Sequence, residues 1–164
     1  AEPHRSLLPN SHSPSPPSTS TTPTGSSRPG RSTNRTIPYR RRVRWIVDGM
    51  NVIGCRPDGW WKDRRQAAVA LVDSLERWAG PDHDVTVVFE KPPNPPIRST
   101  TIAVAHADRA AANSADDEIV RLVQAAEDPS EICVVTSDYA LSTRVREAGA
   151  TAHAAAGFRR LLDG

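Results

Sequence analysis

Short apolar runs alternate with amphipathic stretches along residues 43–164. The runs at 43–48, 84–89, 101–105 and 131–136 contain several β-branched residues, which is typical of buried strands, and a short strand is expected near 150–154. The intervals at about 63–79, 115–127 and 137–149, and the C-terminal stretch, carry apolar residues three or four positions apart, as helices do. This alternation predicts an α/β fold in which a mostly parallel central sheet is covered by helices on both faces, a three-layer α/β/α arrangement.

Two connections stand out between these predicted elements. We expect a loop from the end of the first strand through Gly59, because the segment is rich in Gly, Pro and Asp. The segment "KPPNPPIRST" at 91–100 predicts a stiff loop, because prolines fix φ and remove backbone donors.

The first 42 residues differ in composition from the rest of the chain. They contain nine Ser, six Thr and eight Pro and almost no apolar residues. Such a segment buries too little apolar surface to offset its ordering entropy. We therefore expect a disordered tail over 1–42 and one folded domain over 43–164, which is long enough for a core.

Charge is divided between these two parts. The tail carries seven Arg and one Glu, whereas residues 43–164 carry 14 basic and 18 acidic residues. The basic run "YRRRVR" at 39–44 beside an acidic domain is typical of chains that engage nucleic acid. A tail that only keeps the protein in solution would carry the same charge. On charge alone, this explanation is favoured over binding to nucleic acid.

The cysteines and the apolar stretches exclude several classes of protein. Cys55 and Cys133 are not in a CxxC pattern, which excludes a disulfide scaffold and a zinc site of that type. No apolar stretch is long enough to span a membrane, and the N-terminal residues lack the apolar region of a signal peptide. We expect a cytoplasmic protein without a membrane partner.

Several polar residues directly follow the predicted strands or begin the predicted helices, and their side chains carry oxygen atoms that can bind a cation. The carboxyl ends of parallel strands meet at one edge of a sheet, where ligands bind, so we expect these side chains to gather there. Clustered carboxylates repel one another unless they share protons or a cation, and oxygen ligands suit Mg²⁺ or Mn²⁺. The residues are Asp48, Asn51, Glu90, Asp116, Asp117, Ser137 and Asp138.

Each of these residues also has a simpler explanation. Asp48 with Gly49 is compatible with a turn, and Asn51 with a contact to loop backbone. The sequence Ser-Ala-Asp-Asp at 114–117 fits a helix capping box, and Ser137 or Asp138 fits a helix cap. For any single residue the simpler explanation is favoured, whereas acids in four separate segments jointly favour a site.

Other chemistries fit the sequence poorly. It contains no GxxxxGK[ST], no GxGxxG after the first strand and no GxSxG. A phosphatase with a nucleophilic Asp48 usually has a second acid two residues later, and that residue is Met50. His83, His106 and His153 are scattered, without HExxH spacing; a contact from His106 to a phosphate is less expected than a loop histidine without a role.

Three motifs, "VDGMNVIG", "SADDEIVRLV" and "VVTSDYALS", occur in this order. With them, residues 43–164 resemble the NYN domain family, and within it the YacP-like branch of bacterial ribonucleases, which are relatives of PIN-domain nucleases. The resemblance implies a PIN-like α/β fold and a Mg²⁺-dependent endoribonuclease that cuts single-stranded RNA in the cytoplasm. It also suggests mRNA on or near the ribosome as a substrate, and it predicts no oligomeric state.

The resemblance also assigns roles by motif position. The family's acids fall on Asp48, Asp116 and Asp138, and Asp117 stands where the family tends to be acidic. Asn51 and Ser137 match its DGxN asparagine and SD serine, and we expect both to orient water or a phosphate oxygen. Two features depart from the family, namely Glu90 in place of an Asp and the "PPNPP" loop.

Three predictions concern the surroundings of the site. Asp48, Asp116 and Asp138 would hold one or two divalent ions, with Asp117 or Glu90 completing the shell. Arg64, Arg65 and Arg144 are candidates for basic residues on the rim that follow an RNA backbone. Trp60 and Trp61 are candidates for stacking on bases, although core or lid packing explains them equally well.

Two other functions compete with the endoribonuclease. A non-catalytic RNA- or ribosome-binding module would share the fold without the activity, because fold alone does not imply function. The presence of Asp48, Asp116 and Asp138 together argues against a degenerate site. A metal-dependent phosphatase acting on small phosphoesters is the other alternative.

Overall fold

The computed structural model describes residues 14, 15, 17, 18 and 42–164. The expected disordered tail at 1–42 therefore lies outside the described residues, apart from positions 14, 15, 17, 18 and 42. The same holds for the first three residues of the basic run at 39–44. In the part of that run that is described, the Arg44 guanidinium Nε lies 3.8 Å from a carboxylate oxygen of Asp84.

The described chain forms a five-stranded sheet in the order β3-β2-β1-β4-β5, in which all neighbouring strands are parallel. The chain passes from the central β1 outward through β2 to β3, and then crosses to the other side of β1 to form β4 and β5. The strand order thus reverses between β1 and β4, which is where ligands bind in open α/β sheets. The strands are β1 (Arg44–Asp48), β2 (Asp84–Phe89), β3 (Ala103–His106), β4 (Ile132–Val135) and β5 (Thr151–His153).

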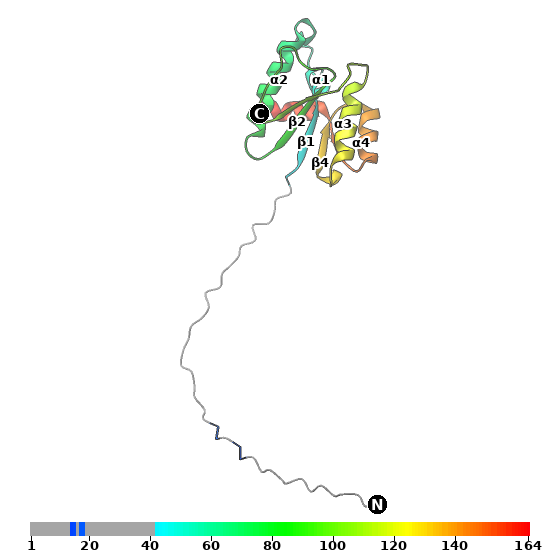
Figure 1. The fold of residues 1–164 in the computed structure, drawn as a ribbon. Helices are drawn as coiled ribbons and strands as arrows, with labels where there is room; N and C mark the ends of the chain where they lie inside the picture. Colours follow the sequence, from blue (N-terminus) through cyan, green and yellow to red (C-terminus); the bar gives the residue numbers. More distant parts are fainter. Residues whose placement is uncertain (1–13, 16, 19–41) are drawn as a thin grey trace, which may run out of the picture. The chain divides into compact units, whose positions relative to one another are not determined.

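Helices cover both faces of this sheet (Figure 1). On one face lie α1 (Gly49–Ile53), α2 (Arg64–Ala79) and α5 (Ala155–Asp163), and on the other lie α3 (Ser114–Ala125) and α4 (Tyr139–Glu147). Leu71, Leu75 and Phe158 are buried in the core of the first face, and Ile119 and Leu141 in that of the second. The predicted three-layer α/β/α fold is confirmed.

Helix α2 follows the sequence prediction closely. The Asp63 carboxylate caps its first turn by accepting a 2.9 Å hydrogen bond from the Gln66 backbone N–H. Gly80, with a φ of 47°, ends the helix in a conformation that glycine adopts without a steric penalty. The buried residues Ala68, Leu71, Val72, Leu75 and Ala79 recur at helical spacing along the face that meets the sheet.

The connection after β1 differs from the expected loop. Residues Gly49–Ile53 form helix α1, and Trp60–Lys62 form a short 3₁₀ helix. Five residues are too few to show helical periodicity, so α1 gave no sequence signal. Its stability comes from packing, because Val52 and Ile53 are buried and no side chain caps it.

Strand β4 is one residue shorter at each end than the strand predicted at 131–136. Glu131 ends a second 3₁₀ helix, Pro129–Glu131, and Thr136 follows the last residue of β4. The Thr136 backbone N–H still donates a 3.0 Å hydrogen bond to the carbonyl of His153 beside it. The chain therefore stays extended up to the residues that form the site.

Two further findings concern the class of protein. Cys55 and Cys133 are free thiols. Across the described ranges, no helix has both the length and the apolar character needed to cross a membrane.

Candidate active site

Asp48 is a buried carboxylate at the end of the central strand, with 4% of its surface exposed. Its Oδ2 accepts a 2.9 Å hydrogen bond from Asn51 Nδ2 and a longer one, 3.4 Å, from Thr136 Oγ1. Burial, and then the negative charge of Asp116, raise the pKa of Asp48 to about 6. A carboxylate kept in such surroundings is typical of functional sites.

Asn51 connects the ends of the two central strands. Its amide Nδ2 donates to Asp48, while its Oδ1 accepts a 3.0 Å hydrogen bond from the Ser137 backbone N–H. Both ends of the amide are therefore used within the protein. The simpler explanation, a contact to loop backbone, is correct, and the contacts support a role in positioning Asp48.

Thr136 is a site residue that sequence reasoning missed. It is buried, with 2% of its surface exposed, and its hydroxyl contacts the carboxylate of Asp48 and the backbone of Asp138. Oγ1 donates to Asp48 Oδ2 and accepts a 3.1 Å hydrogen bond from the Asp138 backbone N–H. The available signal was a hydroxyl residue at the very end of an apolar strand, directly before Ser-Asp.

Ser137 and Asp138 both cap helices. Asp138 Oδ1 accepts a 3.0 Å hydrogen bond from the Leu141 N–H and so caps α4. Ser137 Oγ accepts a 3.1 Å hydrogen bond from the Ala155 N–H, in the first turn of α5. Because Ala154, the residue before α5, supplies no side-chain cap, Ser137 performs this task from another segment.

The start of α3 is fastened to the end of β2 in a way that differs from the expected capping box. The helix begins at Ser114 itself, after Asn113, which has a φ of 62° and makes no side-chain cap. The Ser114 hydroxyl instead donates a 3.1 Å hydrogen bond to the backbone carbonyl of Glu90. This contact brings the acidic first turn of α3 to the same sheet edge as Asp48.

Asp116 is the centre of the acidic cluster. Burial raises its pKa, and the charges of Asp138, Asp117 and Glu90 raise it further, against the opposing charge of Arg144. Asp116 in turn raises the pKa of Asp48. Carboxylates from four separate segments thus act on one another at a single edge of the sheet, as the sequence predicted.

Arg144 is the one of the predicted rim arginines that lies among the acids. From α4, its Nη1 donates a 3.0 Å hydrogen bond to Asp117 Oδ1. Asp117 is largely exposed and is already paired with a cation, so it is placed differently from the buried Asp48.

Gly49 allows the chain to turn closely after Asp48. A Cβ atom at this position would lie 2.7 Å from Phe89 Cε1, which is shorter than real carbon contacts. The absence of a side chain therefore lets the Phe89 ring pack against the first residue of α1.

The chemical type of the side chains in the cluster, though not their arrangement as it stands, suits a hard divalent cation. The side chains are carboxylates, which Mg²⁺ and Mn²⁺ prefer, and the N-terminal acids of α3 face the same edge. No group of three or more His, Cys, Asp or Glu side chains in the described part of the chain is arranged to hold a metal ion. The assignment of Asp48, Asp116, Asp138, Asp117 and Glu90 as ligands stays a prediction.

The remaining predicted residues lie around this edge. Arg64 and Arg65 begin α2, and the Arg64 guanidinium lies 5.5 Å from the centre of the Trp60 ring. Trp60 packs against the core, while Trp61 is 53% exposed. His106 ends β3 and is not in a loop; its Nδ1 lies 2.9 Å from the Ala107 carbonyl oxygen.

A parallel α/β/α domain with acidic side chains at the switch point of its sheet has the features expected of an NYN domain. The sequence pattern of the YacP-like NYN domain matches residues 45–163, and the chain belongs to this family. Membership indicates a nuclease-family function related to RNA. The predicted family is thereby confirmed.

Solved structures give the same fold. Two crystal structures of Rae1 (YacP) from Bacillus subtilis, one of them of a point mutant, are each 24% identical to this chain. Each match covers 73% of this chain. The match covers 73% of the unmutated Rae1 chain, with a TM-score of 0.60, and 74% of the mutant chain, with a TM-score of 0.59. At this identity the likeness shows the fold. No curated protein sequence matched.

Proposed function

We propose that this protein is a divalent-metal-dependent endoribonuclease that hydrolyses phosphodiester bonds of single-stranded RNA. The observation that carries the proposal is the convergence of four acidic segments around Asp116, beside the buried Asp48. Without a partner charge this arrangement is costly, because like charges raise one another's pKa. A bound cation removes that cost, and an RNA phosphate could then approach the cluster.

In this proposal, some residues of the site bind the cation and others position the Asp48 carboxylate. Asp48, Asp116 and Asp138 would hold the cation, with Glu90 and Asp117 beside them. A divalent cation in such a site supplies Lewis acidity toward a phosphoryl oxygen and makes bound water more acidic. Asn51 and Thr136 fix the Asp48 carboxylate through their hydrogen bonds, so that it need not reorganise when the substrate binds.

Two exposed aromatic side chains support single-stranded RNA as the substrate. Tyr139 directly follows Asp138 and is 83% exposed, and Trp61 is 53% exposed. Unpaired bases stack on such side chains, whereas the bases of a duplex are already stacked. Location in the cytoplasm and action on mRNA on or near the ribosome belong to the proposal as settings that the family resemblance implies.

The test is a cleavage assay with the full chain and an end-labelled, unstructured RNA. We expect internal cuts with Mg²⁺ or Mn²⁺, no cuts after EDTA is added, and much slower cutting of the same sequence as a duplex. Asp116→Asn should abolish cutting. Asp73→Asn is the matched control, because Asp73 is an exposed acid on α2 outside the cluster.

The outcome also decides between this proposal and its alternative. RNA that stays intact under every metal condition contradicts the enzyme. If such RNA still binds in a salt-dependent way, the protein is a non-catalytic RNA- or ribosome-binding module. Release of phosphate from a chromogenic phosphoester, with intact RNA, would instead indicate a phosphatase.

A further inference from the structure

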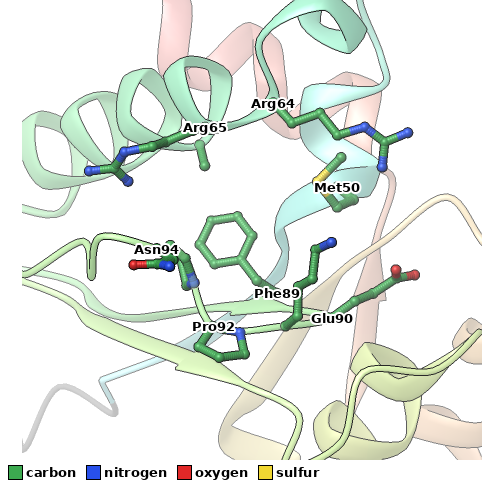
Figure 2. Close-up of a pocket in the computed structure, with 10 residues that line it drawn as sticks. Met50, Arg64, Arg65, Phe89, Glu90, Pro92 and Asn94 are labelled. Carbon is green, nitrogen blue, oxygen red and sulfur yellow. The ribbon is translucent and has the colours of Figure 1, made fainter.

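A cavity of about 430 Å³ lies beside the acidic cluster, between the first turns of α2 and the loop that follows β2. Figure 2 shows Arg64 and Glu90 at one end of this pocket, Arg65 and Asn94 at the other, and the Phe89 ring between them. Its volume falls within the range of about 300–1,000 Å³ that is usual for pockets that bind small molecules.

The walls of the pocket combine apolar surface with cations. Met50, Phe89 and the prolines at 92 and 93 supply the apolar part, and Arg64 and Lys91 supply positive charge. Among the described residues, neither Arg64 nor Lys91 has a carboxylate within ion-pair distance. With Arg65 as a third cation and Glu90 as the one acid, the lining has a net positive charge, so the pocket suits a ligand with a flat apolar face and a negatively charged group.

The wall opposite α2 is held in place. Arg65 Nη1 donates a 2.9 Å hydrogen bond to the Pro95 carbonyl across the pocket. Consecutive prolines limit the backbone freedom of the same loop. A wall whose backbone is already ordered loses little entropy when a ligand binds, and the exposed Asn94 belongs to this wall.

The pocket adjoins the acidic cluster through one shared residue, Glu90. Glu90 lines it and is also one of the charges that raise the pKa of Asp116, while Met50 is two residues beyond Asp48. A strand whose phosphodiester lies over Asp48 and Asp116 would therefore extend its next nucleotide toward this pocket.

We infer that the pocket binds one unpaired base of the RNA strand, next to the bond to be cut, with Arg64 and Lys91 on the adjoining phosphates. The inference rests on the proposed function and adds a subsite to it. The base would lie against Met50 and the proline wall, and the Asn94 amide, which both donates and accepts, would contact the base edge.

The test is a double-mutant cycle between the protein and the RNA. Fluorescent single-stranded RNAs, each with one abasic position, are titrated with the full chain in Ca²⁺ in place of Mg²⁺, so that the acidic cluster is neutralised by a hard cation, and gel electrophoresis checks that the strands stay intact. We expect one abasic position to weaken binding to the wild-type protein about tenfold. In Asn94→Ala and in Met50→Ala the same abasic position should have little further effect, because the pocket contact is already lost.

A matched control separates the pocket from general charge. Arg98→Ala removes an exposed cation from the same loop outside the pocket, and the abasic penalty should persist in it. Arg64→Ala should weaken binding of every strand alike and should reduce the slope of log affinity against log salt by about one.

The outcomes distinguish this inference from the proposed function. If no abasic position matters, or if its penalty is unchanged in both pocket variants, the inference is wrong, while cutting of intact RNA by the wild type leaves the enzyme in place. Coupling without any cutting supports the pocket and contradicts the enzyme. RNA that does not bind at all contradicts both.

Discussion

At the scale of single residues, the site is built around a buried carboxylate whose negative charge lowers the stability of the folded protein. Asp48 is buried, and its pKa of about 6 lies well above the ordinary value of 3.8 for an aspartate. The raised pKa means that the folded state binds this proton more tightly than the unfolded state does. Ionised Asp48 therefore destabilises the fold above pH 6, and this penalty disappears as the pH falls toward 4.

We expect Asp48→Asn to stabilise the metal-free protein while it abolishes RNA cutting. Asparagine can keep an oxygen acceptor for Asn51 and Thr136 without the buried charge. In urea unfolding with EDTA at pH 7.5, its free energy of unfolding should exceed that of the wild type by up to about 3 kcal/mol. At pH 5 the difference should shrink by about half, since the wild-type carboxyl is then largely protonated.

Asp73→Asn is the control here too, because Asp73 is an exposed acid outside the cluster, and it should show no comparable gain in stability at pH 7.5. If Asp48→Asn is less stable than the wild type at pH 7.5, the view that the Asp48 charge destabilises the folded protein is contradicted.

Thr136 gives a second prediction at this scale. Thr136→Val keeps the shape but removes the hydroxyl that contacts Asp48 and accepts from the Asp138 N–H. We expect a loss of about 1–3 kcal/mol in stability, because the N–H is left without a partner, and a fall in kcat of the RNA assay. Thr136→Ser should restore both, and equal defects in the two variants would argue against a role for the hydroxyl.

At the scale of elements, the predictable features were those with enough residues to show a period. The predicted bounds of the strands and of α2 agree with the structure within a few residues, whereas the sequence predicts a loop where the five-residue helix α1 lies. The acidic edge was predictable because strand ends and helix starts follow from the fold. The contacts of Thr136 and the capping of α5 by Ser137 were not, because they join segments that are far apart in sequence.

Ser137 links two elements, and this leads to a prediction. If its hydroxyl serves as the cap of α5, Ser137→Ala should lower the free energy of unfolding by about 1 kcal/mol and leave RNA cutting within a few-fold of the wild type. Chemical unfolding and the cleavage assay test this together. A large loss of cutting at unchanged stability would instead support the contact with water or phosphate that the sequence suggested.

At the scale of the whole molecule, the domain places its acids and its cations in adjoining regions. The acids lie at the switch point between β1 and β4, while Arg64, Arg65 and Lys91 line the neighbouring pocket. An acidic centre alone repels RNA, so the account requires a cation there and basic residues beside it. The role of the basic segment before residue 42 stays a prediction from the sequence.

The cation requirement also predicts a linkage between metal and stability. Millimolar Mg²⁺ or Mn²⁺ should raise the Tm of the wild-type protein, since a ligand that binds only the folded state stabilises it. The same addition should leave Asp116→Asn unchanged, and thermal unfolding at several metal concentrations measures both. An equal rise in the two proteins would indicate binding elsewhere.

The most direct measurement of the central claim is a crystal structure of the protein soaked with Mn²⁺, with the cation located from its anomalous scattering. The account predicts a Mn²⁺ peak in contact with the carboxylates of Asp48, Asp116 and Asp138. Soaked crystals in which these carboxylates stay without a peak, or in which Mn²⁺ binds only elsewhere, would contradict it.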